Sequence, residues 1–221
     1  MQPALLCLCV FTHVVSALNA TSLLFNSTAT SFVPTALRAV LNTGPPPPSG
    51  AYGTAVWAGQ STAVRFTAPP DVPGYGATLA EVQLTIAANR YSPSNLRLSV
   101  VQDSGRNSPG TTVLESRVIR VPAYDGRVTI TASHPGNLYL YPGELFWVTL
   151  EGDARYVQDA VSWLDSPNGV AWTAFNAQSV GLKEAGEDTQ TLMGRKNSMD
   201  TVAGWIVERT TRASSIRVLV A

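Results

Sequence analysis

Residues 79–87 read LAEVQLTIA, and this stretch decides the fold class of the 221-residue chain. Val82, Leu84 and Ile86 alternate with polar residues, which is the period-2 pattern of a β-strand with one buried face. A second stretch, LFWVTL at residues 145–150, is apolar at nearly every position. We therefore expect the first strand to be half exposed and the second to be covered on both faces.

Short runs of the same kind follow one another from Thr54 onward, and each run is closed by Gly, Pro, Asn or Asp. No stretch has a convincing helical period. About ten short strands at this spacing predict an all-β domain, which we expect to be an antiparallel two-sheet sandwich or jelly roll. The strands are expected near residues 63–67, 79–87, 96–102, 113–121, 128–132, 145–150, 160–164, 170–175, 203–209 and 216–220.

Both cysteines of the chain lie in its first nine residues, inside an apolar leader. The apolar run covers residues 5–15 and ends in the small residues Val15-Ser16-Ala17, as in a secretory signal peptide. We assign residues 1–20 to this signal and predict an extracellular protein. The mature chain would then contain no cysteine, so a hydrophobic core has to hold the fold without disulfides.

We interpret residues 21–53 as an N-terminal arm and residues 54–221 as the sandwich domain. Two sequons predict glycosylation at Asn19 and Asn26, the first only if the leader is cleaved before it. The run Pro45-Pro46-Pro47-Pro48 lacks the donors of a β-ladder, and we interpret it as a spacer. A ligand for a proline-binding module is the other interpretation.

The charges of the chain argue against two classes of partner. Fifteen basic and fifteen acidic residues give a net charge of zero, and Lys183 and Lys196 are the only lysines. Such a chain has no long-range field that would attract nucleic acid or an anionic membrane. The leader is too short to span a bilayer, and no other long apolar run exists. We predict neither a nucleic-acid partner nor membrane insertion.

The residue types that carry most enzymatic chemistry are scarce. The mature chain would have one histidine, His134, and no thiol, so a nucleophilic triad lacks its parts and a zinc site lacks its ligands. Because His134 precedes Pro135-Gly136, we expect it on an exposed turn. Asp153, Asp159 and Asp165 lack the dense acidic spacing of a calcium loop. We predict no catalytic residue, metal or cofactor; a carboxylate-based polysaccharide hydrolase is the third-ranked hypothesis.

Residues 162–173 read SWLDSPNGVAWT and predict a β-hairpin. If residues 167–169 form a three-residue loop, Leu164 pairs with Trp172 and Trp163 points to the opposite face. A four-residue loop would instead place Trp163 opposite Trp172 on one face. The sequence leaves both registers open.

In the first register, Trp163 shares a face with Asp165 and Thr173. A tryptophan on a rigid sheet can stack on the apolar face of a sugar while neighbouring polar groups bind its hydroxyls. We therefore predict Trp163, Asp165 and Thr173 as ligand-binding residues. Burial of Trp163 in the core is the competing interpretation.

A family resemblance adds to this picture. It is carried by LRLSV at residues 96–100, DSG at 103–105 leading to SPG at 108–110, VTI at 128–130, and residues 138–143 leading into FWVTL at 146–150. In these signals the chain resembles the choice-of-anchor R domain of bacterial exported proteins, over less than half of its length. The resemblance implies an exported β-sandwich of unassigned biochemical role. No anchoring tail follows, so we expect any surface attachment to be non-covalent or to use the N-terminal arm.

These observations lead to two hypotheses about function. The first is a secreted, non-catalytic binding module at the cell surface or in the extracellular matrix, whose partner is carbohydrate or glycoprotein. The alternative is a structural subunit that assembles into a homo- or hetero-oligomer through exposed strand edges and the N-terminal arm.

Overall fold

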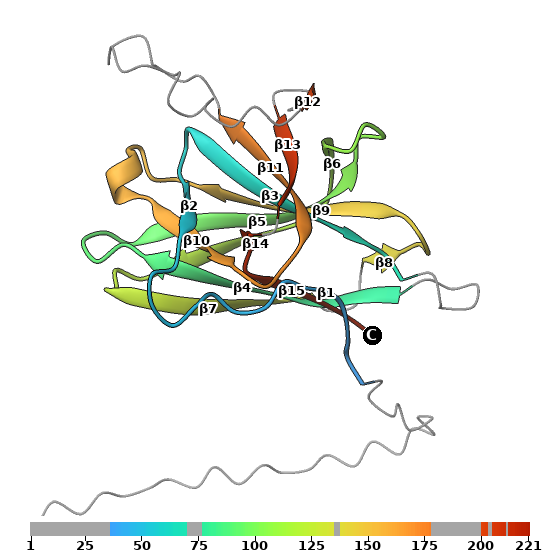
Figure 1. Ribbon diagram of the computed structural model, residues 1–221, viewed down its shortest axis with the longest axis horizontal. Helices are drawn as coiled ribbons and strands as arrows, with labels where there is room; N and C mark the ends of the chain where they lie inside the picture. The colour runs from blue at the N-terminus through green and yellow to red at the C-terminus, as the bar shows by residue number, and fades with distance from the viewer. Residues whose placement is uncertain (1–35, 70–76, 135–137, 178–199, 203–204, 211) are drawn as a thin grey trace, which may run out of the picture. The chain divides into compact units, whose positions relative to one another are not determined.

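The computed structural model confirms the predicted all-β sandwich (Figure 1). In the part of the chain that it describes, antiparallel strands form two sheets that pack against each other. Thr35–Ala221 is one compact unit. The predicted leader and both sequons lie outside the described residues. Those residues are 36–69, 77–134, 138–177, 200–202, 205–210 and 212–221.

The first sheet is built around β4, which has partners along both edges. β15 and β10 pair with one edge, and β7 and β8 pair with the other. β1 extends the sheet beyond β15, while β2 and β14 pair with β10. The strands are β1 (Arg38–Asn42), β2 (Gly53–Val56), β4 (Ala77–Ala88), β7 (Gly126–Ser133), β8 (Tyr139–Leu140), β10 (Val161–Ser166), β14 (Ala213–Ser214) and β15 (Ile216–Val220).

The second sheet has the order β12-β13-β11-β3-β9-β5-β6. Its strands are β3 (Gln60–Thr67), β5 (Ser94–Asp103), β6 (Pro109–Val121), β9 (Leu145–Gly152), β11 (Ala171–Ala177), β12 (Asp200–Val202) and β13 (Trp205–Thr210). A 3₁₀ turn, η1 (Val157–Asp159), precedes β10. Each predicted strand overlaps an observed one.

The core lies between the sheets, where alternate side chains of both layers meet. On β4, Val82, Leu84 and Ile86 are buried while the residues between them are half exposed, as the alternation predicts. On β9, Trp147 is buried on the face opposite Phe146, so this strand is covered on both faces, also as predicted.

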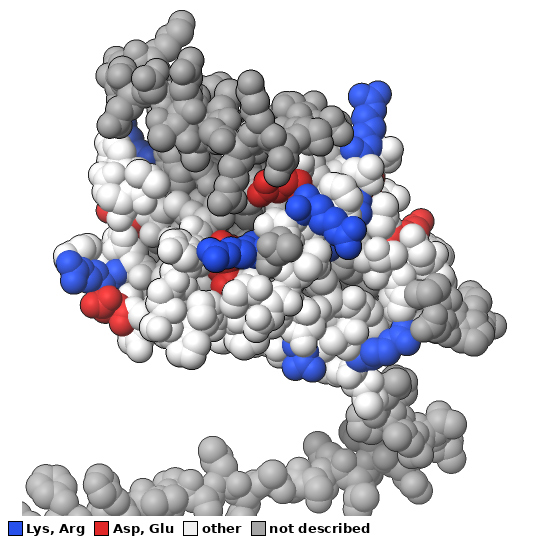
Figure 2. Space-filling model, in the orientation of Figure 1, with Lys and Arg blue, Asp and Glu red and all other residues white. Residues whose placement is uncertain are grey.

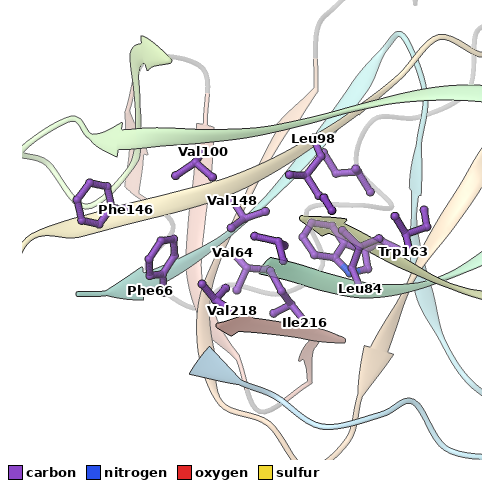
Figure 3. Close-up of a cluster of buried hydrophobic side chains, with 14 of the residues drawn as sticks. Val64, Phe66, Leu84, Leu98, Val100, Phe146, Val148, Trp163, Ile216 and Val218 are labelled. Carbon is purple, nitrogen blue, oxygen red and sulfur yellow. The ribbon is translucent and has the colours of Figure 1, made fainter. Parts of the chain in front are cut away.

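Figure 3 shows how the two layers interlock. The rings of Phe66 and Phe146 stack with their centroids 5.5 Å apart. The indole of Trp163 lies among the aliphatic side chains and is 0% exposed. Burying an aliphatic or phenylalanine side chain contributes roughly 1.5–3 kcal/mol, so a core of this kind can hold the fold without disulfides.

The sandwich begins before the predicted boundary at residue 54, because β1 pairs with β15. Residues 43–52, which we call the strap, join β1 to β2 and contain the proline run outside both sheets. The Thr43 hydroxyl donates to the carbonyl of Ser214 (2.9 Å) and accepts from the amide of Ile216 (2.9 Å). Farther along, Arg127 donates to the carbonyl of Pro47. The proline run is therefore part of a pinned strap, in place of the predicted spacer.

The predicted hairpin at residues 162–173 is wrong in both registers. β10 belongs to the first sheet and β11 to the second, so the chain crosses between the layers at this turn. The backbone of β10 is engaged by strands that are distant in sequence: Leu164 pairs with Gly53 and Ser166 with Ala213. These partners leave β11 to pair with β3 and β13.

We predict that Trp163→Ala destabilises the fold by about 3–5 kcal/mol, because it opens a large cavity in the core. Urea unfolding followed by fluorescence or circular dichroism measures the change. Tyr139→Ala is the matched control, since Tyr139 is 59% exposed and its truncation leaves no cavity. Equal unfolding midpoints for the two variants would contradict the placement of Trp163.

Candidate binding surface

The three predicted ligand-binding residues do not form one site. Trp163 faces the core, and its Nε1 donates a 3.0 Å hydrogen bond to the carbonyl of Ser215. Thr173 is 1% exposed on β11 of the other sheet. The predicted exposure of Trp163 is therefore wrong, and so is the prediction that it shares a face with Thr173. The cause is the register of β10 against β2 and β4, which turns Trp163 inward.

Asp165 lines a cavity. This cavity, of about 120 Å³, is lined by Asp165 with Tyr52, Arg212 and two prolines. The Asp165 amide donates to the carbonyl of Tyr52 (2.8 Å), and the Arg212 guanidinium lies 5.4 Å from the centre of the Tyr52 ring. Burial raises the pKa of the Asp165 carboxyl, while Arg212 and a hydrogen bond from Ser214 act in the opposite direction.

His134 is buried, so its predicted place on an exposed turn is wrong. Its amide donates to the carbonyl of Ala80 (2.7 Å), so the β4–β7 ladder continues to His134. The imidazole at this position is buried. His134 Nδ1 lies 2.7 Å from Glu115 Oε1 on β6, an oxygen that also accepts from Arg117. The imidazole thus links the two sheets at one side of the sandwich.

Three connections leave one end of the sandwich, at the left in Figure 1, and each carries an exposed tyrosine. Tyr91 in the β4–β5 loop is 75% exposed, Tyr124 in the β6–β7 loop 52%, and Tyr156 in the β9–β10 connection 48%. Aromatic rings exposed on neighbouring loops are typical of recognition surfaces, because they offer contact area at a small entropic cost. We call these three residues the tyrosine surface.

Asn89 links the three connections to one another. Its Nδ2 donates to the carbonyl of Gln158 (2.8 Å) in the β9–β10 connection, and its own carbonyl accepts from the amide of Tyr124 (3.0 Å). Within its loop, Asn89 Oδ1 accepts from the amides of Tyr91 (2.8 Å) and Ser92 (3.3 Å). One asparagine therefore sets the relative positions of the loops that carry the tyrosines.

The base of the same end is fixed by a second polar contact between strands. Asp153, just after β9, accepts hydrogen bonds from the amide (2.9 Å) and from Nδ2 (2.7 Å) of Asn95 on β5. The amide of Asp153 donates in return to the carbonyl of Asn95 (3.2 Å). The strand ends that support the loops are therefore held in register.

Arginines flank two of the three rings. The guanidinium of Arg90 lies 4.4 Å from the centre of the Tyr91 ring, and that of Arg155 lies 5.3 Å from the centre of the Tyr156 ring. Arg90 also comes within 4.0 Å of Asp125, but both side chains are well exposed, so this ion pair contributes little. The surface thus combines aromatic faces with hydrogen-bond donors.

A second aromatic cluster lies on the outer face of the second sheet, but its aromatic and polar groups contact one another. Arg65 lies 4.6 Å from the centre of the Trp172 ring, and its Nη1 donates to Asn107 Oδ1 (2.8 Å). Trp147 is 0% exposed and donates through Nε1 to Asp103 Oδ2 (2.7 Å). Burial lowers the pKa of Arg65, and Asp103 acts in the opposite direction. These groups satisfy one another, so we regard the cluster as structural.

Comparison of the chain with models of known protein families, with curated proteins and with solved structures gives no match. The resemblance to the choice-of-anchor R domain stays a prediction. Within the described ranges, no helix has the length and apolar character needed to cross a membrane. The same ranges bring no three His, Cys, Asp or Glu side chains together as a metal site, and Asp153, Asp159 and Asp165 do not converge.

The raised pKa of Asp165 predicts a pH dependence of stability. Because folding favours the neutral carboxyl, its stabilising effect is complete below the unfolded pKa and is lost as the pH rises through the folded pKa. Asp165→Asn should remove this loss. The free energy of unfolding of the variant should therefore increase relative to that of the wild type as the pH rises above 3.8.

Urea midpoints measured at a series of pH values below and above 3.8 test the expectation. Asp125→Asn is the control for loss of an exposed carboxylate. Carboxyl carbon resonances in NMR give the titration of Asp165 directly. A titration midpoint at or below the ordinary value of 3.8 contradicts the prediction.

Proposed function

We propose that this protein is a secreted, non-catalytic binding module that recognises carbohydrate, free or carried by a glycoprotein, through the tyrosine surface. The observation that carries the proposal is the placement of three exposed tyrosines on three loops that Asn89 ties together. The predicted leader and sequons favour an extracellular setting.

The chemistry of the surface suits a sugar. A tyrosine ring stacks its flat face on the C–H side of a pyranose, and the phenol hydroxyl remains free to bind a sugar hydroxyl. Arg90 and Arg155 lie next to the rings and supply further donors. Such a surface binds without a deep cavity, because the tyrosines themselves form the contact area.

Rigidity of the loops favours binding of a small ligand. A loop that is ordered only on binding would lose affinity through its conformational entropy. The hydrogen bonds of Asn89 fix the loops before any ligand arrives. The proposed site is therefore pre-organised.

The charge distribution favours short-range recognition. On the face shown in Figure 2, basic and acidic side chains are scattered among neutral ones. The whole chain has a net charge of zero. A ligand is then selected by contacts at the surface, with little long-range steering.

Glycan-array binding tests the proposal. We expect Tyr91→Ala and Tyr156→Ala each to reduce the wild-type signal about tenfold or more, since a lost stacking contact of roughly 1.5 kcal/mol corresponds to that factor. Tyr139→Ala and Tyr141→Ala are matched controls, because the exposures of these tyrosines (59% and 64%) lie between those of Tyr156 and Tyr91, and both lie outside the tyrosine surface.

Asn89→Ala gives an independent arm of the same experiment, because it keeps all three rings and removes the side-chain bonds that position them. We expect weaker array binding together with faster amide hydrogen exchange at Tyr91 and Ser92, because the amides of these two residues donate hydrogen bonds to Asn89 Oδ1. The proposal fails if no glycan binds the wild type, or if the control tyrosines matter as much as Tyr91.

The alternative function, assembly through a strand edge, is favoured by one observation. β6 is 13 residues long, and among the described strands it pairs only with β5. Val113 and Val118 on this strand are 56% and 66% exposed. A long edge with exposed apolar side chains is a template for pairing with another strand. The bulge near Val113 limits such pairing to the part of β6 that follows it.

Assembly predicts an oligomer in size-exclusion chromatography with light scattering. Val118→Lys should shift it to monomer, because a charge on the edge opposes strand addition. Val170→Lys is the control, at a valine of similar exposure away from β6. A wild-type monomer at all concentrations contradicts self-assembly through this edge.

A further inference from the structure

A groove of about 270 Å³ lies against the outer face of the first sheet, beside the strap. β4 contributes Gln83 and Thr85, β7 contributes Thr129, and β15 contributes Arg217. Gln83 is opposite Arg217, and Thr85 is opposite Thr129. These residues alternate with buried ones such as Leu84, which places their side chains on the outer face.

The strap forms a fixed wall of this groove through Gly44 and Pro45. The carbonyl of Gly44 accepts from Ser215 Oγ (2.8 Å), and its amide donates to Asn42 Oδ1 (3.1 Å). Gly44 has a φ of +88°, and a Cβ at this position would lie 3.2 Å from Ser166 Oγ. Pro45 adds a backbone with a locked φ. The wall is therefore built before any ligand is present.

Among the described residues that line the groove, Arg217 has the one charged side chain. In the described part of the chain, no carboxylate lies within 4.0 Å of its guanidinium. Glu81, on the same face of β4, instead accepts a hydrogen bond from Gln83 Nε2 (3.1 Å). The guanidinium is thus available to an anion, and the hydroxyls of Thr85 and Thr129 are suited to a hydroxylated ligand.

We propose that this groove is a second binding site, which holds a single sugar unit carrying a carboxylate, such as a uronic acid residue. A guanidinium binds a carboxylate through two parallel hydrogen bonds, and side-chain hydroxyls and amides match sugar hydroxyls. The volume lies just below the range of about 300–1,000 Å³ for drug-sized ligands, which suits one ring. The choice of a sugar rests on the proposed function, whereas the groove and its free cation do not.

The test is an NMR titration of the ¹⁵N-labelled protein with methyl β-D-glucuronide. Methyl β-D-glucoside, which lacks the carboxylate, and sodium acetate, which lacks the sugar, are the comparison ligands. We expect saturable amide shifts at Thr85, Thr129 and Arg217 with the glucuronide, and at least tenfold weaker binding of the other two. If the glucoside binds as tightly as the glucuronide, the proposed contact of Arg217 with the carboxylate is wrong. If acetate binds as tightly, the proposed recognition of the sugar ring is wrong.

Arg217→Gln should weaken glucuronide binding about tenfold or more, since it removes a charge-assisted pair. Arg120→Gln is the matched control, an exposed arginine on β6 of the other sheet. Thr129→Val provides a second variant at an exposed position, and it should weaken binding while the fold is unchanged. Wild-type affinity in both Arg217→Gln and Thr129→Val overturns the proposal.

The two proposals fail separately. Glucuronide shifts that persist in Tyr91→Ala, combined with an array signal that does not depend on Tyr91 or Tyr156, would remove the tyrosine surface as a site and leave the groove. Array binding that depends on Tyr91, combined with no glucuronide shift, would remove the groove and leave the tyrosine surface.

Discussion

The contact between the inward faces of the two sheets is the constraint on which the rest of this protein depends. It is made by alternate residues of each strand, such as Leu84 on β4 and Val148 on β9, so it also determines which residues face outward. Gln83 and Thr85 alternate with the buried residues of β4, so their side chains face outward and line the groove. The loops that carry the tyrosine surface are neighbours because the packed strands that they connect end at the same side of the sandwich.

The strands that pack this core were predictable from period-2 alternation, because the pattern is local and one face of each strand is buried. β1 and β2 were not predicted. Each is short, they flank a proline run, and their partners β15 and β10 lie far along the chain. Nothing in residues 38–42 or 53–56 alone indicates pairing with a distant strand. Residues 38–42 therefore fall in the predicted arm, and residues 54–56 fall in the predicted domain without a strand assignment.

The candidate sites were less predictable than the fold. The orientation of Trp163 follows from its partners on β2 and β4, whereas the sequence argument paired it with its neighbours. The tyrosine surface depends on Asn89 meeting Gln158, 69 residues away. A tyrosine next to an arginine in a loop, as at residues 90–91 and 155–156, was the signal present in the sequence. It becomes informative only when the loops are known to be neighbours.

The closure of the strap has a consequence for how the molecule is made. Thr43 is held by Ile216, 173 residues later in the chain. During synthesis, the edge of β4 that pairs with β15 likewise lacks its partner until residues 216–220 have been made, and such an edge is open to wrong strand pairing for that time. Closure of the first sheet is therefore a late step of folding, because its contacts join residues that are far apart in the chain.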